Sequence, residues 1–114
     1  MTDSEFQDLV EDTLDQVEEY IENLAQTLDL DADSSRTDNV LNLDFGTQGK
    51  VILNSQVASY ELWLAAKSGG FHYRWAGSEW QNTRGGQAFS AHFVQVLAEQ
   101  LGTTCPPLVL VLGG

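Results

Sequence analysis

Between residues 6 and 24, apolar side chains recur at intervals of three and four, and the opposite side of the same segment is acidic. This spacing predicts an amphipathic helix with a single buried stripe. Thr2, Asp3 and Ser4 can each cap its start, and Ser4 with Gln7 has the spacing of a capping box. The stripe consists of Phe6, Leu9, Val10, Leu14, Val17, Ile21 and Leu24. A stripe of this length requires a second layer of structure to cover it.

The middle of the chain supplies that layer. Apolar and polar residues alternate there, and GTQG and KSGG separate two pairs of such segments, as in hairpins. Helical spacing returns after RGG, with Gly102 at the expected end of a second helix. Strands are expected at residues 40–45, 50–54, 60–66, 71–75 and 79–81, and residues 25–33 are expected to form a connector or a first short strand. The order predicts an α+β fold, a two-layer α-β sandwich with both helices on one face of an antiparallel sheet.

We expect one domain over residues 1–114, which include an apolar C-terminal tail at 103–114. Pro106 and Pro107 prevent that tail from being helical, so it is expected to lie extended against the helices. Cys105 is the single cysteine and is expected to pack as a small apolar residue. A lone cysteine, an acidic N-terminus and the lack of a long apolar run favour a soluble cytoplasmic protein.

The charge of the chain is unevenly distributed. Residues 1–44 contain 14 acidic residues and one basic residue, Arg36, for a net charge of −13, whereas residues 45–114 carry +1. Binding to nucleic acid requires basic residues, so this distribution argues against it. It favours cations or a basic protein surface as partners.

The acidic residues of the first helix fall on one arc opposite the apolar stripe. Between Asp8 and Glu22, eight acidic pairs are spaced three or four residues apart, and together they cost on the order of 2–3 kcal/mol at low salt. A solvated face that only confers solubility usually mixes both signs of charge, and here no Lys or Arg is interleaved. Carboxylates without His or Cys suit hard cations in an open, partly hydrated and weak site.

One specific metal motif can be rejected. The triplet Asp29, Asp31 and Asp33 resembles the start of an EF-hand loop, but the sixth position is Ser34 rather than Gly, and the twelfth is Val40 rather than Glu. A strand is also expected to follow, where an EF-hand has a helix.

Strand alternation predicts which side chains lie on the outer face of the sheet. Trp63 falls there, near Ile52 and Asn54, and an exposed tryptophan is a favoured interface anchor. The alternative is that a loop or the tail covers it. His72 and His92 are expected to be ordinary surface histidines. No nucleophile motif or phosphate-binding loop is present in the sequence, so we do not expect an enzyme.

Several stretches together resemble the frataxin family, specifically its bacterial CyaY branch. They are VEEYIE in the acidic helix, DLDAD before the sheet, and WLAAKSGGFHY and EWQNTRGG before the closing helix. The resemblance covers residues 3–102. It implies an iron-binding protein that regulates iron–sulfur cluster assembly, binds Fe(II) or Fe(III) weakly, and docks a cysteine desulfurase and its scaffold protein. It also implies a monomer, with iron-dependent oligomers and a weak ferroxidase-like activity left open.

The resemblance assigns the family's functions to particular residues of this chain. The implied iron ligands are Glu11, Asp12, Asp15, Glu18, Glu19, Glu22, Asp29, Asp31 and Asp33. The implied partner contacts are Trp63, Asn54, Ile52, Glu18, Glu19 and Glu22. Charge reversal at the three glutamates is expected to weaken metal binding and docking without loss of stability.

The sequence departs from the bacterial pattern in two places. Asn23, Ala25 and Thr27 stand where further carboxylates are expected, so the acidic surface is expected to bind less metal and to be split in two. The tail after Gly102 is longer and more apolar than expected, and it is a candidate to lie between the helices. A function from another class also stays open, namely an acidic mimic that inhibits a basic protein and has no metal role.

Overall fold

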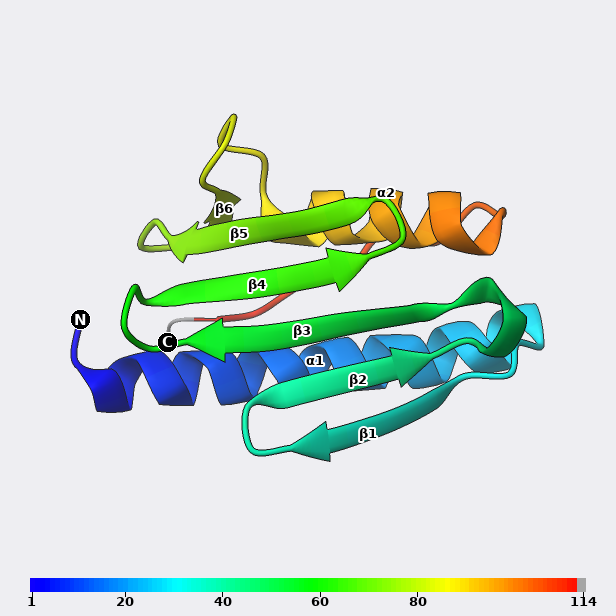
Figure 1. The fold of residues 1–114 in the computed structure, drawn as a ribbon, viewed down its shortest axis with the longest axis horizontal. Coiled ribbons are helices and arrows are strands. Elements are labelled where there is room, and N and C mark those ends of the chain that lie inside the picture. Colours follow the sequence, from blue (N-terminus) through cyan, green and yellow to red (C-terminus); the bar gives the residue numbers. More distant parts are fainter. Residues whose placement is uncertain (113–114) are drawn as a thin grey trace.

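The computed structural model describes residues 1–112, which form two helices and a six-stranded sheet (Figure 1). The elements are α1 (Asp3–Leu28), β1 (Asp33–Thr37), β2 (Val40–Asp44), the 3-10 turn η1 (Gly46–Gln48), β3 (Lys50–Gln56), β4 (Glu61–Ala66), β5 (Gly69–Trp75), β6 (Trp80–Asn82) and α2 (Phe89–Leu101). Every neighbouring pair of strands is antiparallel, in the order β1-β2-β3-β4-β5-β6. Both helices cover one face of the sheet and leave the other uncovered. The predicted α-β sandwich is confirmed.

Helix α1 is capped at both ends. The Thr2 side chain accepts a hydrogen bond from the Glu5 backbone N–H, and the Glu5 carboxylate accepts one from the Thr2 N–H, each at 3.1 Å. The capping box is therefore Thr2–Glu5 and not Ser4–Gln7. At the other end, Asp29 takes a left-handed conformation and its N–H bonds to the Ala25 carbonyl. The expectation of a connector from residue 25 was wrong for residues 25–28, because Leu28 packs against the core and extends the helix.

The two main hairpins lie where the sequence places them. Phe45 closes the first turn by donating its N–H to the Gly49 carbonyl at 2.9 Å, and the second turn joins β4 to β5 at Lys67 and Ser68. Strand β1 was not predicted beyond its first residue. Its sequence, DSSRT, has no apolar alternation and is mostly exposed. It exists because it pairs along β2, from Asp33 opposite Asp44 to Thr37 opposite Val40.

The core lies between the sheet and the helices. All seven residues of the predicted α1 stripe are buried, as are the inward residues of the sheet, Leu41, Leu43, Phe45, Val51, Leu53, Leu62, Leu64 and Tyr73. His92 also belongs here, and its assignment as a surface histidine was wrong. It lies on the inner side of α2, where its Nδ1 is hydrogen-bonded to the Tyr73 hydroxyl and its ring packs edge-on against Phe71. Burial lowers the pKa of His92.

The tail runs back between the two helices, behind the sheet in Figure 1. Gln16 of α1 holds it by a pair of hydrogen bonds, to the N–H and the carbonyl of Val111, each at 2.9 Å. Tyr20 donates to the Pro106 carbonyl at 2.6 Å. Cys105 and Leu108 are buried, as expected for an extended segment packed on the helices. The last two residues of the predicted tail, 113 and 114, lie outside the described residues.

Candidate functional site: an acidic ridge and an uncovered sheet face

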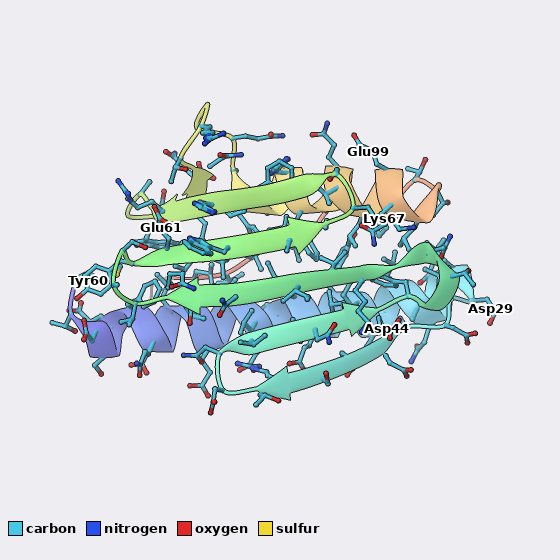
Figure 2. All side chains as sticks on the ribbon, in the orientation of Figure 1. Asp29, Asp44, Tyr60, Glu61, Lys67 and Glu99 are labelled. Carbon is cyan, nitrogen blue, oxygen red and sulfur yellow. The ribbon has the colours of Figure 1, made fainter. Side chains whose placement is uncertain are left out.

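The nine predicted metal ligands, called the acidic ridge below, occupy two segments of the structure. The first segment lies along the exposed side of α1, where every member is exposed except Glu18, which is half-buried. Its members are Glu11, Asp12, Asp15, Glu18, Glu19 and Glu22. The second segment, Asp29, Asp31 and Asp33, lies beyond the C-terminal turn of α1 and at the start of β1 (Figure 2).

Arg36 lies against the middle of the first segment and was not included in any predicted site. One guanidinium nitrogen, Nη1, is 2.5 Å from a carboxylate oxygen of Asp15 and 3.2 Å from one of Glu18. The other, Nη2, donates to the main-chain carbonyl of Glu11 at 3.1 Å. Hydrogen bonds to the two carboxylates raise the pKa of Arg36, against the opposing effect of its burial. The signal in the sequence was its status as the single base in residues 1–44.

The ridge is not a preassembled metal cage. Within residues 1–112, no group of three or more His, Cys, Asp or Glu side chains is positioned to hold a metal ion. Helix geometry explains this, because exposed side chains at successive turns point outward in parallel and do not converge on one point. The chemistry of the donors suits hard cations, but a bound ion needs side-chain rearrangement and water to complete its coordination shell.

On the sheet side, Trp63 lies on the uncovered face, as predicted. The register places it between Asn54 of β3 and His72 of β5. Its ring stacks on the His72 ring with centroids 4.1 Å apart and planes 5° apart. The described part of the tail lies against α1 on the other side of the sheet, so the tail does not cover Trp63. Trp63, Asn54 and Ile52 are all half-buried, because neighbouring side chains on the sheet surround them.

Glu61 organises this face and was not singled out from the sequence. It is 7% exposed and receives hydrogen bonds from the Trp63 indole at 2.9 Å, the Arg74 guanidinium at 2.9 Å and the Ser59 hydroxyl at 3.2 Å. The bond from Trp63, aided by Arg74 and Ser59 and opposed by burial, lowers the pKa of Glu61. His72 Nδ1 lies 3.8 Å from the same carboxylate. Figure 2 places Glu61 near the Tyr60 end of β4.

The cross-strand register contained the signal for this cluster. Glu61 directly opposes Arg74, and Trp63 two residues later lies on the same face. An acid opposite a base, beside a tryptophan with an N–H to donate, is a recognisable pattern once the pairing of the two strands is known.

None of the helices in residues 1–112 is both long and apolar enough to span a bilayer.

Comparisons with known proteins agree with the fold. The model of the frataxin-like domain matches residues 1–103. An iron–sulfur cluster assembly protein CyaY from Janthinobacterium sp. (strain Marseille) is 47% identical over 111 residues, which cover 96% of each chain. Another protein of that name, from Herminiimonas arsenicoxydans, is 48% identical over 103 residues, 90% of this chain and 92% of the relative.

Solved structures give the same result. A frataxin from Psychromonas ingrahamii superposes with a TM-score of 0.72 at 29% identity, over 92% of this chain and 96% of that one. A trimeric frataxin from Saccharomyces cerevisiae, complexed with ferrous iron, superposes with a TM-score of 0.71 at 22% identity, over 82% and 86% of the two chains, and supports the fold alone. The family model matches residues 1–103, and the two relatives named CyaY are 47% and 48% identical to this chain. The chain therefore belongs to the frataxin-like family.

Proposed function

We propose that this protein binds iron weakly on the acidic ridge and regulates iron–sulfur cluster assembly by docking the assembly machinery. The observation that carries the proposal is the concentration of exposed carboxylates along α1, in a segment of the chain with a net charge of −13. Repulsion between these like charges destabilises the folded helix, so the arrangement does not serve stability. Binding of a ligand explains it better. The relatives' name, iron–sulfur cluster assembly protein, supports the same role.

The ridge and the sheet face suit different partners. The ridge complements a basic surface, and we assign it to the cysteine desulfurase through Glu18, Glu19 and Glu22. The sheet face presents a flat, stacked aromatic pair, Trp63 on His72, and we assign it to the scaffold protein. The role is one of binding and regulation in the bacterial cytoplasm, not catalysis.

Iron would reach the ridge as an exchangeable ligand. Carboxylate oxygens bind Fe(II) and Fe(III) as hard donors, and exposed side chains leave most of the coordination shell to water. A metal ion on the ridge reduces its negative charge, and this gives iron a means of modulating the docking of a basic partner.

The direct test is an amide NMR titration of the metal-free protein with Fe(II) under anaerobic conditions, with Ca(II) as the control ion. We expect broadening confined to residues 11–33 and stronger for iron than for calcium. An effect spread over the whole chain, or one that calcium reproduces at equal concentration, would contradict a metal role for the ridge.

A second function, an acidic mimic that docks a basic protein without any metal, is favoured by one observation. The ridge carboxylates are not gathered into a ligand cluster in the described residues. The two functions separate in a desulfurase binding assay with and without Fe(II). Our proposal expects the affinity to change with iron at a concentration that titrates the ridge, whereas a mimic binds equally in both conditions.

A further inference from the structure

The acidic ridge already holds one cation in this structure, the guanidinium of Arg36. It lies between Asp15 and Glu18, one turn apart on α1, and reaches the Glu11 carbonyl with its second nitrogen. The Arg36 side chain is 22% exposed and that of Glu18 is 28% exposed, so their contact is partly shielded from water, whereas the Asp15 side chain is 63% exposed. The nitrogen Nη1 meets both carboxylates, and charge and hydrogen bonding act together in such a contact.

The fold explains how a strand residue reaches the helix surface. Arg36 pairs with Leu41, whose side chain points into the core, so Arg36 also projects toward the helical layer. Because β1 is the edge strand, Arg36 passes beside α1 and not beneath it. It is the one half-buried residue of β1, and the other four are exposed. The contact therefore ties the edge of the sheet to the ridge.

We propose that Arg36 is a specificity-determining residue of the ridge, an internal cation that occupies Asp15 and Glu18 and excludes a metal ion from its centre. Metal ions are thereby restricted to the carboxylates on either side, unless they displace Arg36. The inference rests on the proposed function, because it concerns where and how tightly the ridge binds metal. It also gives a physical cause for a split ridge that differs from the missing carboxylates at residues 23–27.

The test compares Arg36→Gln with Arg84→Gln, two changes that each take the net charge from −12 to −13. Arg84 is exposed in the turn after β6 and makes no ion pair with the ridge in the described residues, so Arg84→Gln controls for net charge. Arg36→Lys is a third variant, which keeps the charge but loses the planar fork.

Affinity for Fe(II) is measured anaerobically by NMR for the wild type and each variant. We expect Arg36→Gln to bind about three- to tenfold more tightly than the wild type, with new broadening centred on residues 15–18. Arg84→Gln is expected to match the wild type, and Arg36→Lys to lie between. In the wild type, the Arg36 side-chain Nε–H resonance is expected to shift as iron is added, a readout that needs no variant.

The outcomes separate this inference from the proposed function. If the wild type and Arg36→Gln bind iron on the ridge equally and the Arg36 resonance does not move, the inference is wrong while the iron function stands. If neither protein shows a response on the ridge, both fail. Binding that appears only in Arg36→Gln supports the inference and shows that Arg36 prevents metal from binding to the ridge of the wild type.

Discussion

Glutamates on α1 and on β4 have opposite surroundings, although the two elements belong to one small domain. Glu19 and Glu22 on α1 project into solvent among other carboxylates and make no ion pair in the described part of the chain. Glu61 on β4 is buried on the uncovered face of the sheet and accepts hydrogen bonds from three different side chains. One surface leaves its negative charge available to a partner, whereas the other neutralises it internally.

Because of this difference, the two kinds of carboxylate make opposite contributions to folding stability. Repulsion among exposed carboxylates opposes folding and is relieved when a cation or a basic surface arrives. The Glu61 carboxylate supports folding, because three donors on the sheet depend on it. Its bond to the indole also holds Trp63 flat against His72, so the sheet face is ordered before any partner binds. Neutralising a carboxylate should therefore have opposite effects on stability in the two places.

The largest effect is expected for Glu61→Ala. The change leaves the Trp63 indole, the Arg74 guanidinium and the Ser59 hydroxyl without their acceptor, and we expect a loss of about 1–3 kcal/mol in the free energy of unfolding. Urea denaturation followed by circular dichroism measures it. The matched variant is Glu99→Ala, which removes an exposed glutamate from α2 and should change stability by less than about 0.5 kcal/mol. Equal effects of the two variants would show that the cluster around Glu61 does not stabilise the sheet.

The next effect is a pH dependence. Because the folded protein holds the pKa of Glu61 below its ordinary value of 4.5, the ionised carboxylate contributes stability above that value, and the contribution is lost as the pH falls through the folded pKa. The stability difference between the wild type and Glu61→Gln should be constant above about pH 6 and should shrink below pH 4.5. Both proteins carry the same acidic ridge, so its titration cancels in the difference.

Trp63→Phe provides the control for that measurement. It keeps an aromatic ring on the sheet but removes the indole N–H, the largest cause of the lowered pKa. We expect the pKa of Glu61, followed by NMR of its side-chain carboxyl carbon, to rise toward 4.5 in this variant. An unchanged pKa would place the cause in Arg74 and Ser59 instead.

The features that repeat along the chain could be predicted from the sequence. The apolar stripe of α1, the two hairpins and the outward position of Trp63 each follow from a period of 3.6 or 2 residues. The helical end at Leu28 and the strand β1 could not, because both depend on tertiary contacts, with the core in one case and with β2 in the other. DSSRT has no strand pattern of its own.

Arg36 and Glu61, the residues missed at the two surfaces, each have a charged partner that is distant in the sequence. Arg36 contacts side chains on α1 18 and 21 residues away, and Glu61 bonds to Arg74 13 residues away. His92 was misassigned for the same reason, since its partner Tyr73 lies on a strand 19 residues earlier. Such pairs become visible only when the register and the packing of the layers are known.

The smallest effect is expected on α1, and its sign is opposite to that at Glu61. Glu19→Gln with Glu22→Gln removes three like-charge contacts, between residues 15 and 19, 18 and 22, and 19 and 22. At about 0.2–0.5 kcal/mol each, their removal should raise the free energy of unfolding by roughly 0.5–1.5 kcal/mol at low salt, and the gain should fall as salt screens the charges. Denaturation at two salt concentrations measures both the gain in the free energy of unfolding and its dependence on salt.

Glu18 is kept unchanged, because it bonds to Arg36 and its loss would remove a favourable pair together with the repulsion. A decrease in stability would mean that these glutamates support the helix, and it would remove the physical argument that the ridge is maintained for a ligand.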